Sequence, residues 1–157
     1  DLSRWQSMID LNLTGAFLTM KAALADVTRG SSGPRRIIFI ASTAALKGYP
    51  YVAAYCAAKH GVVGLARALS LELQPTGVTV NAVCPGYTDT PLLDAAAEKI
   101  SAKTGRSAEN ARAVLARDNP SGRLVKPEEV ASVVLRLCSP SSASVNGQAI
   151  EVTGGPQ

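Results

Sequence analysis

Tyr55 and Lys59 could handle a proton together, because they stand four residues apart. In a helix, residues at this spacing lie on one face, one turn above the other. A free tyrosine has a pKa near ~10, and a nearby cation favours the phenolate and lowers that value. The pair therefore predicts a general acid or base usable near neutral pH. Considered alone, the same pair is also ordinary on the solvated face of a helix.

Polar residues that follow two apolar runs place further chemistry near this pair. Ser42 comes directly after one run, and Pro85-Gly86 comes directly after the next, trailed by Thr88 and Thr90. Ligands of open parallel sheets bind outside the carboxyl ends of the strands. We therefore expect Ser42 and the two threonines to line one crevice. The alternative for Ser42 is a loop serine that hydrogen-bonds its own backbone.

Periodicity and turn signals predict the elements that must position these residues. Apolar residues at helical spacing predict helices over residues 1–27, 52–72, from 91 onward, and 127–138. Short β-branched runs predict buried strands over residues 36–41, 78–84 and 149–152. The polar segment 95–119 is predicted to form one or two helices, and residues 29–34 an exposed turn. This order predicts an α/β fold whose parallel strands are joined by helical crossovers.

The composition excludes several classes of function. The chain has 157 residues and a net charge of +4, and its one adjacent basic pair, Arg35-Arg36, is not interleaved with aromatics, so we expect no nucleic-acid partner. Cys56, Cys84 and Cys138 form no C-x-x-C pair, which favours reduced thiols and a cytoplasmic location. With His60 as its single histidine, the chain is not expected to bind a metal. No apolar run approaches the length of a membrane span, so we expect no membrane partner.

Five short motifs, taken together, resemble those of the short-chain dehydrogenase/reductase family. They are Asn12–Gly15, Ile40–Ser42, Tyr55–Gly61, Val80–Gly86 with Thr90, and Thr153–Gly155. The resemblance extends over residues 1–157 and is to the catalytic and C-terminal part of the family's domain. It implies a single Rossmann-like domain with a doubly wound parallel sheet, of which this chain is the C-terminal portion.

The family's glycine-rich turn after its first strand has no counterpart in this chain. We therefore expect a further segment of about 90 residues before Asp1, at ~30 or more residues per βαβ unit. That segment would carry most of the adenosine site and the residues that select NAD or NADP.

By the same resemblance, four residues would carry the chemistry. Tyr55 would give a proton to a carbonyl oxygen as hydride arrives, or take it back from an alcohol. Lys59 would lower the pKa of Tyr55 and hold the nicotinamide ribose hydroxyls, and Ser42 would orient the substrate oxygen. Asn12 is unusual inside a helix, because its amide competes for backbone hydrogen bonds. It would bend that helix and hold a water that links Lys59 to solvent.

The resemblance also implies that NAD or NADP binds beside Tyr55 and Lys59, against the loop that follows the second strand. Pro85-Gly86 would bring the backbone close to the cofactor. The Tyr87–Thr88 backbone would lie near the nicotinamide carboxamide, and Thr90 near the pyrophosphate. The start of a helix just beyond Thr90 would offer free N–H groups to a phosphate. The alternative for Thr90 is a plain N-cap of that helix.

Residues 95–119 correspond to the family's variable substrate lid. Its positive charge comes from Lys99, Lys103, Arg106, Arg112 and Arg117, and is offset only in part by Glu98, Glu109 and Asp118 within the segment and by Asp94 just before it. A cationic lid would favour an acyl-CoA or carrier-linked substrate, and the alternative is a solvated pair of helices. The sequence around Ser42 and Tyr55 also resembles ketoacyl and polyketide ketoreductases and 3-hydroxyacyl-CoA dehydrogenases. This likeness implies that the substrate is a 3-oxo/3-hydroxyacyl thioester. Asp89 could either contact that substrate or cap its own turn.

The predicted function is that of an NAD(P)-dependent oxidoreductase, which interconverts a secondary alcohol and a ketone as small-molecule substrates. The resemblance also implies a homodimer or homotetramer, formed through the helices that begin near Asp1 and Val52. The alternatives are a non-catalytic dinucleotide-binding scaffold and a family epimerase or dehydratase. A Ser/His/Asp hydrolase is excluded, because the chain has no G-x-S-x-G elbow and its one histidine, His60, lies beside Lys59.

Overall fold

A computed structural model describes residues 1–29 and 33–155, so the turn predicted over residues 29–34 lies partly outside the described residues. The α-helices are α1 Leu2–Ile9, α2 Gly15–Thr28, α3 Ala53–Glu72, α4 Pro91–Thr104, α5 Ala108–Arg117 and α6 Pro127–Cys138. The strands are β1 Arg35–Ile40, β2 Val78–Pro85 and β3 Ala149–Val152. Short helical turns are η1 Asp10–Thr14, η2 Thr43–Ala45, η3 Gln74–Thr76 and η4 Pro140–Ser142.

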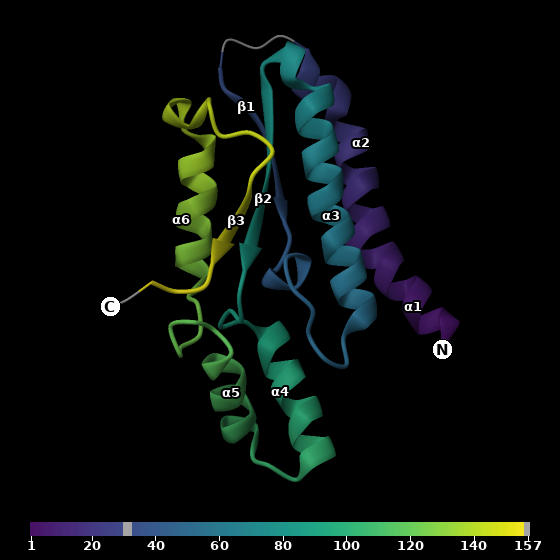
Figure 1. Ribbon diagram of the computed structural model, residues 1–157, viewed down its shortest axis with the longest axis vertical. Helices are drawn as coiled ribbons and strands as arrows, with labels where there is room; N and C mark the ends of the chain where they lie inside the picture. Colours follow the sequence, from purple (N-terminus) through teal and green to yellow (C-terminus); the bar gives the residue numbers. More distant parts are fainter. Residues whose placement is uncertain (30–32, 156–157) are drawn as a thin grey trace.

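The described strands form one parallel sheet in the order β1-β2-β3 (Figure 1). Residues 35–40 of β1 pair with 78–83 of β2, and residues 82–85 of β2 pair with 149–152 of β3. Each connection between strands contains helices, which lets parallel neighbours form. The predicted α/β fold with parallel strands is confirmed.

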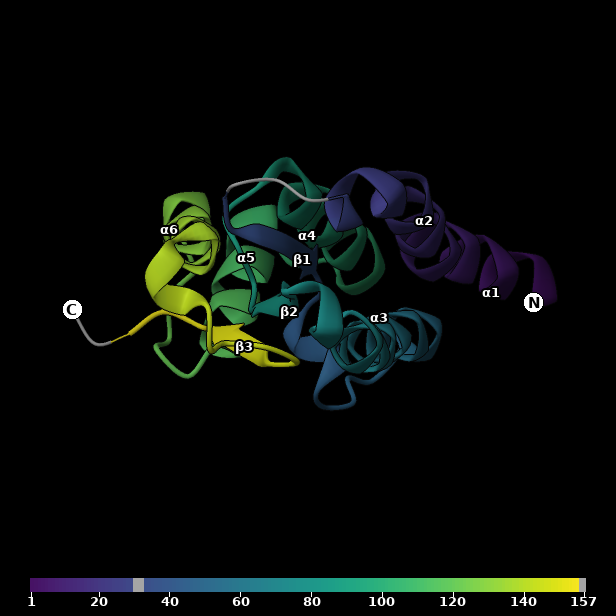
Figure 2. The same ribbon diagram turned by 90° about the horizontal axis from the view of Figure 1, so that it is seen from above.

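Helices cover both faces of this sheet. Figure 2 shows α6 on one side of the strands, and α2 with α3 on the other. Successive side chains of a strand point to opposite faces. Accordingly, Val80 and Cys84 pack in the core against α2 and α3, whereas Val83 packs with Leu137 of α6. Because both faces of β2 are covered, its run of apolar residues reads as continuous rather than alternating.

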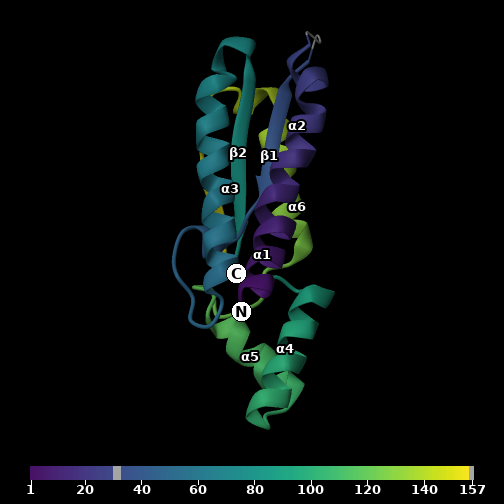
Figure 3. The same cartoon turned by 90° about the vertical axis from the view of Figure 1, so that its right-hand side faces the viewer.

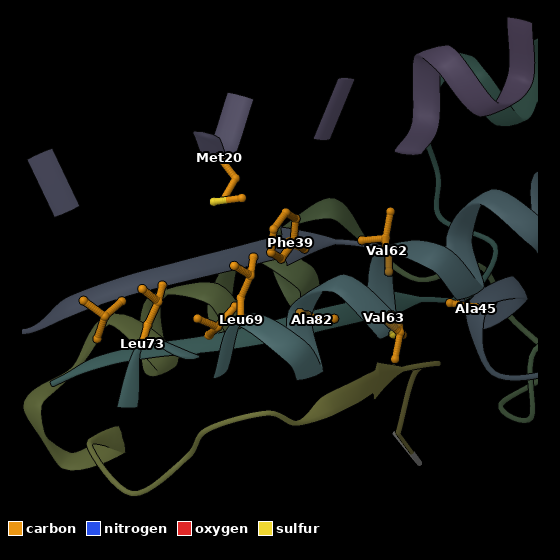
Figure 4. Close-up of a cluster of buried hydrophobic side chains, with 13 residues drawn as sticks. Met20, Phe39, Ala45, Val62, Val63, Leu69, Leu73 and Ala82 are labelled. Carbon is orange, nitrogen blue, oxygen red and sulfur yellow. The ribbon is translucent and has the colours of Figure 1, made fainter. Parts of the chain in front are cut away.

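The larger core fills the space between the sheet and helices α2 and α3 (Figure 4). Met20 of α2 and Phe39 of β1 meet Val62 and Leu69 of α3 there. Small residues such as Ala82, which is fully buried, let the helices approach the sheet closely. The face of α3 that carries this core therefore fixes the helix that holds Tyr55 and Lys59.

The N-terminal helix, predicted as one element over residues 1–27, contains a π-helical turn. Asp1 caps the helix as expected, since its side chain accepts a hydrogen bond from the Arg4 amide at 2.9 Å. The π-helical turn η1 then joins α1 to α2 and has Asn12 at its centre. Such turns interrupt an α-helix locally and are frequent at functional sites.

Helices α4 and α5 form a hairpin beyond the carboxyl ends of the strands (Figures 1 and 3). The predicted helical segment 95–119 resolves into two helices for two local reasons. Gly105 ends α4 in the left-handed region at φ 69°, and the Ser107 side chain accepts from the Asn110 amide at 3.2 Å to begin α5. The hairpin has an apolar cluster of its own, made by Leu93, Ala97, Ala111 and Leu115.

Candidate active site

Ser42 and Tyr55 come together where β1 ends and α3 begins. Ser42 Oγ accepts a hydrogen bond from the Ala44 amide at 3.1 Å and so begins the turn η2. The backbone-bonded serine considered from the sequence is therefore observed. It does not exclude a second role, because a hydroxyl has one donor and two acceptor sites. The hydroxyl also lies beside the Tyr55 phenol, close enough to affect its pKa.

Burial raises the pKa of Tyr55 above its ordinary value, and the Ser42 hydroxyl only partly opposes this by lowering it. Desolvation penalises the charged phenolate, and here it outweighs the neighbouring polar group. Lys59 is not among the groups that shift the pKa of Tyr55 here, so the lowering predicted for it stays a prediction. Burial therefore favours the neutral phenol of Tyr55, which is the form that can donate a proton.

Lys59 lies beside Tyr55 but is directed to other partners. Its Nζ donates to the Ile40 carbonyl at 3.2 Å and lies 5.6 Å from the centroid of the Tyr55 ring. Burial lowers the pKa of Lys59, for the same desolvation reason. The ammonium thus faces the ring and the end of β1, which explains why it does not dominate the phenol's pKa.

Asn12 shares a groove with Lys59 between α2 and β1. The groove is lined by both side chains together with Ile40 and apolar residues of the two elements. Asn12 Nδ2 donates to the Met8 carbonyl and contacts Met8 Sδ, each at 3.1 Å. The side-chain amide thus supplements the backbone bonds of the π-helical turn. The structure brings Asn12 and Lys59 to one groove, and the water link predicted between them stays a prediction.

Gly61 lets α3 cross close to the π-helical turn η1, which holds Asn12 in this place. A Cβ at Gly61 would lie 2.7 Å from Cδ2 of Leu13, the residue after Asn12. Gly61→Val is therefore expected to destabilise the protein by roughly 1–3 kcal/mol, the usual cost of overpacking. Urea unfolding of the full-length protein measures this change.

Gly64 supplies the matched control for that substitution. It lies in the same helix, and a Cβ there would meet nothing within 4 Å. Gly64→Ala is expected to leave stability unchanged or to raise it by up to about 1 kcal/mol, from helix propensity. Equal stability of Gly61→Val and the wild type would contradict the close crossing.

The loop after β2 carries the predicted cofactor residues. Pro85 ends the strand, and the Gly86 amide donates to the Val152 carbonyl of β3 at 2.9 Å. Thr88 then forms a parallel bridge with Val125. The loop thus extends the sheet at the carboxyl end of β2, where it is hydrogen-bonded to β3 and to the segment of Val125. Thr88 Oγ1 donates to the Gly86 carbonyl at 3.0 Å.

The side chains of Thr90 and Asp89 in this loop both have partners within the protein. Thr90 stands at the N-cap position of α4, but its side chain makes no capping bond and donates instead to the Thr88 carbonyl at 3.3 Å. Asp89 accepts from Arg112 Nη2 of α5 at 2.8 Å, and Arg112 also pairs with Asp94 of α4. The cation predicted to serve the substrate lid at position 112 is therefore engaged by two carboxylates.

Sequence reasoning missed two residues that shape this site. Asn119 is 3% exposed, and its side chain bonds the backbone of Tyr87. Tyr49 meets the Tyr87 ring edge-on, with centroids 6.1 Å apart, and its hydroxyl hydrogen-bonds Thr43 Oγ1 at 2.9 Å. An asparagine before a proline reads as a turn residue, so nothing in the sequence around Asn119 signals a buried role.

The remaining candidates have structural roles. His60 is exposed, and its Nδ1 hydrogen-bonds the Cys56 carbonyl at 2.9 Å. Cys84 is fully buried in the core, as expected. Within residues 1–29 and 33–155, no three His, Cys, Asp or Glu side chains gather as metal ligands would. No helix in the same described ranges is long and apolar enough to cross a lipid bilayer.

The parallel sheet and the group formed by Ser42, Tyr55, Lys59 and Asn12 define the class of protein. A sequence model of the family described as enoyl-(acyl carrier protein) reductase matches residues 1–157. The chain therefore belongs to the short-chain dehydrogenase/reductase family. The resemblance seen in the sequence motifs is confirmed.

Within this family, the chain is similar to ketoreductases. It is 43% identical to a putative ketoacyl reductase of Streptomyces coelicolor, over 96% of this chain and 58% of the relative. It is 40% identical to a 3-oxoacyl-[acyl-carrier-protein] reductase of Synechocystis, over 98% of this chain and 56% of the relative. A crystal structure of an F189W actinorhodin polyketide ketoreductase with NADPH matches at a TM-score of 0.84 and 41% identity, over 96% and 58% of the two chains. The chain thus spans somewhat more than half the length of these relatives.

Proposed function

We propose that the full-length protein is an NAD(P)-dependent oxidoreductase that interconverts a secondary alcohol and a ketone. The observation that carries this proposal is the placement of Ser42 beside a protonated Tyr55, with Lys59 one helical turn away. This arrangement can bind a carbonyl oxygen and protonate it as charge develops there. We also propose that residues 1–157 form the catalytic and C-terminal part of one Rossmann-like domain.

The residues present fit a nicotinamide cofactor. The loop of residues 85–90 offers backbone groups and leads into the N-terminus of α4, where helix N–H groups favour a phosphate. Lys59 would hold ribose hydroxyls from its place beside Tyr55. Asn12, at the π-helical turn, would hold a water that passes protons between Lys59 and solvent. When bound, NAD or NADP would supply or accept the hydride, and the protein provides position and proton transfer.

For the substrate we propose a 3-oxo or 3-hydroxyacyl thioester. The names of the ketoacyl and 3-oxoacyl reductase relatives support this class. The α4–α5 hairpin also carries exposed cations, which suit the phosphates of a CoA or carrier arm. These cations are Lys99, Lys103, Arg106 and Arg117. Arg112 is excluded from this set, because it is paired with Asp89 and Asp94.

The test gives the full-length protein acetoacetyl-CoA together with NADH or NADPH. The nicotinamide absorbance measures oxidation of the cofactor. Turnover supports the reductase and the thioester class. Cofactor binding without turnover on this or any other ketone favours the non-catalytic scaffold. Product formation without net change in NAD(P)H absorbance favours an epimerase or dehydratase. Failure to bind either cofactor overturns the proposal.

The raised pKa of Tyr55 predicts the pH dependence of the reaction. A phenol with a raised pKa stays protonated through neutral pH, so initial rates of ketone reduction should hold there and fall only at alkaline pH. Alcohol oxidation needs the phenolate and should instead rise toward alkaline pH. Profiles of kcat/KM against pH in both directions measure this. A fall in reduction centred near neutral pH would show that the phenol ionises far more easily than its burial implies.

We further propose a homodimer or homotetramer located in the cytoplasm. Large apolar side chains are exposed along the helix from α1 to α2, at Leu2, Trp5, Leu11, Phe17 and Leu18. Burial of some of these side chains against a second copy would remove them from water. Three free thiols, Cys56, Cys84 and Cys138, suit a reducing compartment. A monomeric mass by light scattering of the full-length protein would contradict the oligomer.

A further inference from the structure

Asn119 lies where the α4–α5 hairpin returns to the sheet. It follows the last turn of α5, and its backbone N–H donates to the Ala116 carbonyl at 3.2 Å. Its side chain is 3% exposed. A buried amide side chain is costly unless its donors and acceptor are satisfied, so its partners indicate what the residue does.

Those partners are all backbone groups of neighbouring segments. Asn119 Oδ1 accepts from the Tyr87 amide at 2.9 Å, while Nδ2 donates to the Tyr87 carbonyl at 2.9 Å and to the Arg123 carbonyl at 2.7 Å. One carboxamide therefore satisfies both peptide groups of Tyr87. Asparagine suits this task because it combines two donors with an acceptor on a short side chain.

Val125 holds the same side of the loop. Its amide donates to the Tyr87 carbonyl, and its carbonyl accepts from the Asp89 amide, each at 2.9 Å. Successive peptide groups of an extended segment point to opposite sides. The N–H and C=O of Thr88 are thus directed away from Val125, and Tyr87 has no backbone group left over. Within the Tyr87–Thr88 backbone, which is predicted to lie near the nicotinamide carboxamide, the Tyr87 groups are thus already bonded within the protein.

Gly86 and Asn119 form a matched pair. A Cβ at Gly86 would clash with Oδ1 of Asn119. The absence of a side chain at position 86 therefore makes room for Asn119 as well as for any ligand. The Arg112–Asp89 ion pair makes a second connection between α5 and the loop.

We propose that Asn119 is a positioning residue for cofactor binding. It fixes the Tyr87 peptide groups so that the Thr88 N–H is presented to the nicotinamide carboxamide, while the Thr88 carbonyl accepts from Thr90 Oγ1. Because it stands at the end of α5, it also couples the position of the substrate hairpin to that of the cofactor loop. The inference rests on the proposed NAD(P) site.

The experiment compares Asn119→Ala and Asn119→Asp in the full-length protein. Alanine removes all three hydrogen bonds of the side chain. Aspartate keeps the shape and one acceptor, but it places a carboxylate beside two carbonyls. Both variants are expected to weaken the binding of NADPH or NADH roughly tenfold or more, because hydrogen bonds that hold the loop are lost. Fluorescence titration measures this affinity. KM for the cofactor should rise more than kcat falls.

Asn146 provides the control. It also holds backbone through its side chain, accepting from the Val80 amide at 2.8 Å and donating to the Ser70 carbonyl at 3.0 Å, at the opposite end of β2. Asn146→Ala should lower Tm and leave cofactor affinity unchanged. Wild-type cofactor affinity in both Asn119 variants overturns the inference alone. Absence of cofactor binding in the wild type and in Asn146→Ala overturns the proposed function and this inference together.

Discussion

Replacing Tyr55 with phenylalanine is expected to lower kcat for ketone reduction roughly 10²- to 10⁴-fold, the usual contribution of a positioned general acid. The substitution removes one hydroxyl and keeps the ring that packs beside Lys59. Because burial keeps this phenol protonated, the loss falls on proton donation to the substrate oxygen. Steady-state rates on the full-length protein measure the effect, with cofactor affinity by fluorescence as the companion readout.

Tyr51 offers a matched control four residues earlier. Its side chain is fully exposed, so Tyr51→Phe removes the same hydroxyl from a place where it contacts water. This variant should retain wild-type kcat. A Tyr55→Phe protein that binds cofactor and keeps full activity would show that another group donates the proton.

Gly86→Ala is expected to weaken cofactor binding by roughly 10- to 100-fold and to destabilise the protein. The added methyl group must displace the Asn119 carboxamide, which three hydrogen bonds hold in a buried place. Overpacking of this kind costs about 1–3 kcal/mol. The displaced side chain would also leave the Tyr87 N–H unpaired, at about 1–3 kcal/mol for a buried group, whereas the Tyr87 carbonyl would keep the Val125 amide as a donor. Fluorescence titration with NADPH and thermal unfolding measure the two effects.

Gly48→Ala is the control for that substitution. A Cβ at Gly48 would meet nothing within 4 Å, although the residue lies in the neighbouring loop before α3. It should bind cofactor as the wild type does. If Gly86→Ala matched Gly48→Ala in both measurements, the tight pairing of Gly86 with Asn119 would be wrong.

Most element bounds could be predicted because their signals are local. The strand over residues 149–152 and the helix over 127–138 have the bounds predicted from β-branched residues and from Pro127 with its following acids. The helix of Tyr55 begins within one residue of its predicted start. The π-helical turn at Asn12 could not be predicted from the spacing of apolar residues, because helical spacing persists on both sides of it.

The contacts of the candidate site were less predictable, because they join segments far apart in the chain. Asn119 meets Tyr87 across 32 positions, and Arg112 meets Asp89 across 23. Neither pair has a spacing that marks it as a pair. Arg112 was expected among the cations of the lid, and Asp89 was expected either to contact substrate or to cap its turn, but the structure pairs the two side chains.

The family, the order of helices and strands, and the residues that could move a proton were readable in the chain before folding. They depend on residue type and short spacing, as in Tyr55 and Lys59 on one helical face. The environment of Tyr55 became visible only once the chain was packed, because burial raises the pKa of its phenol. The tertiary structure also decided which peptide of the loop after β2 is directed away from its neighbouring segment. Burial and long-range hydrogen bonds are properties of the packed chain, and no local pattern encodes them.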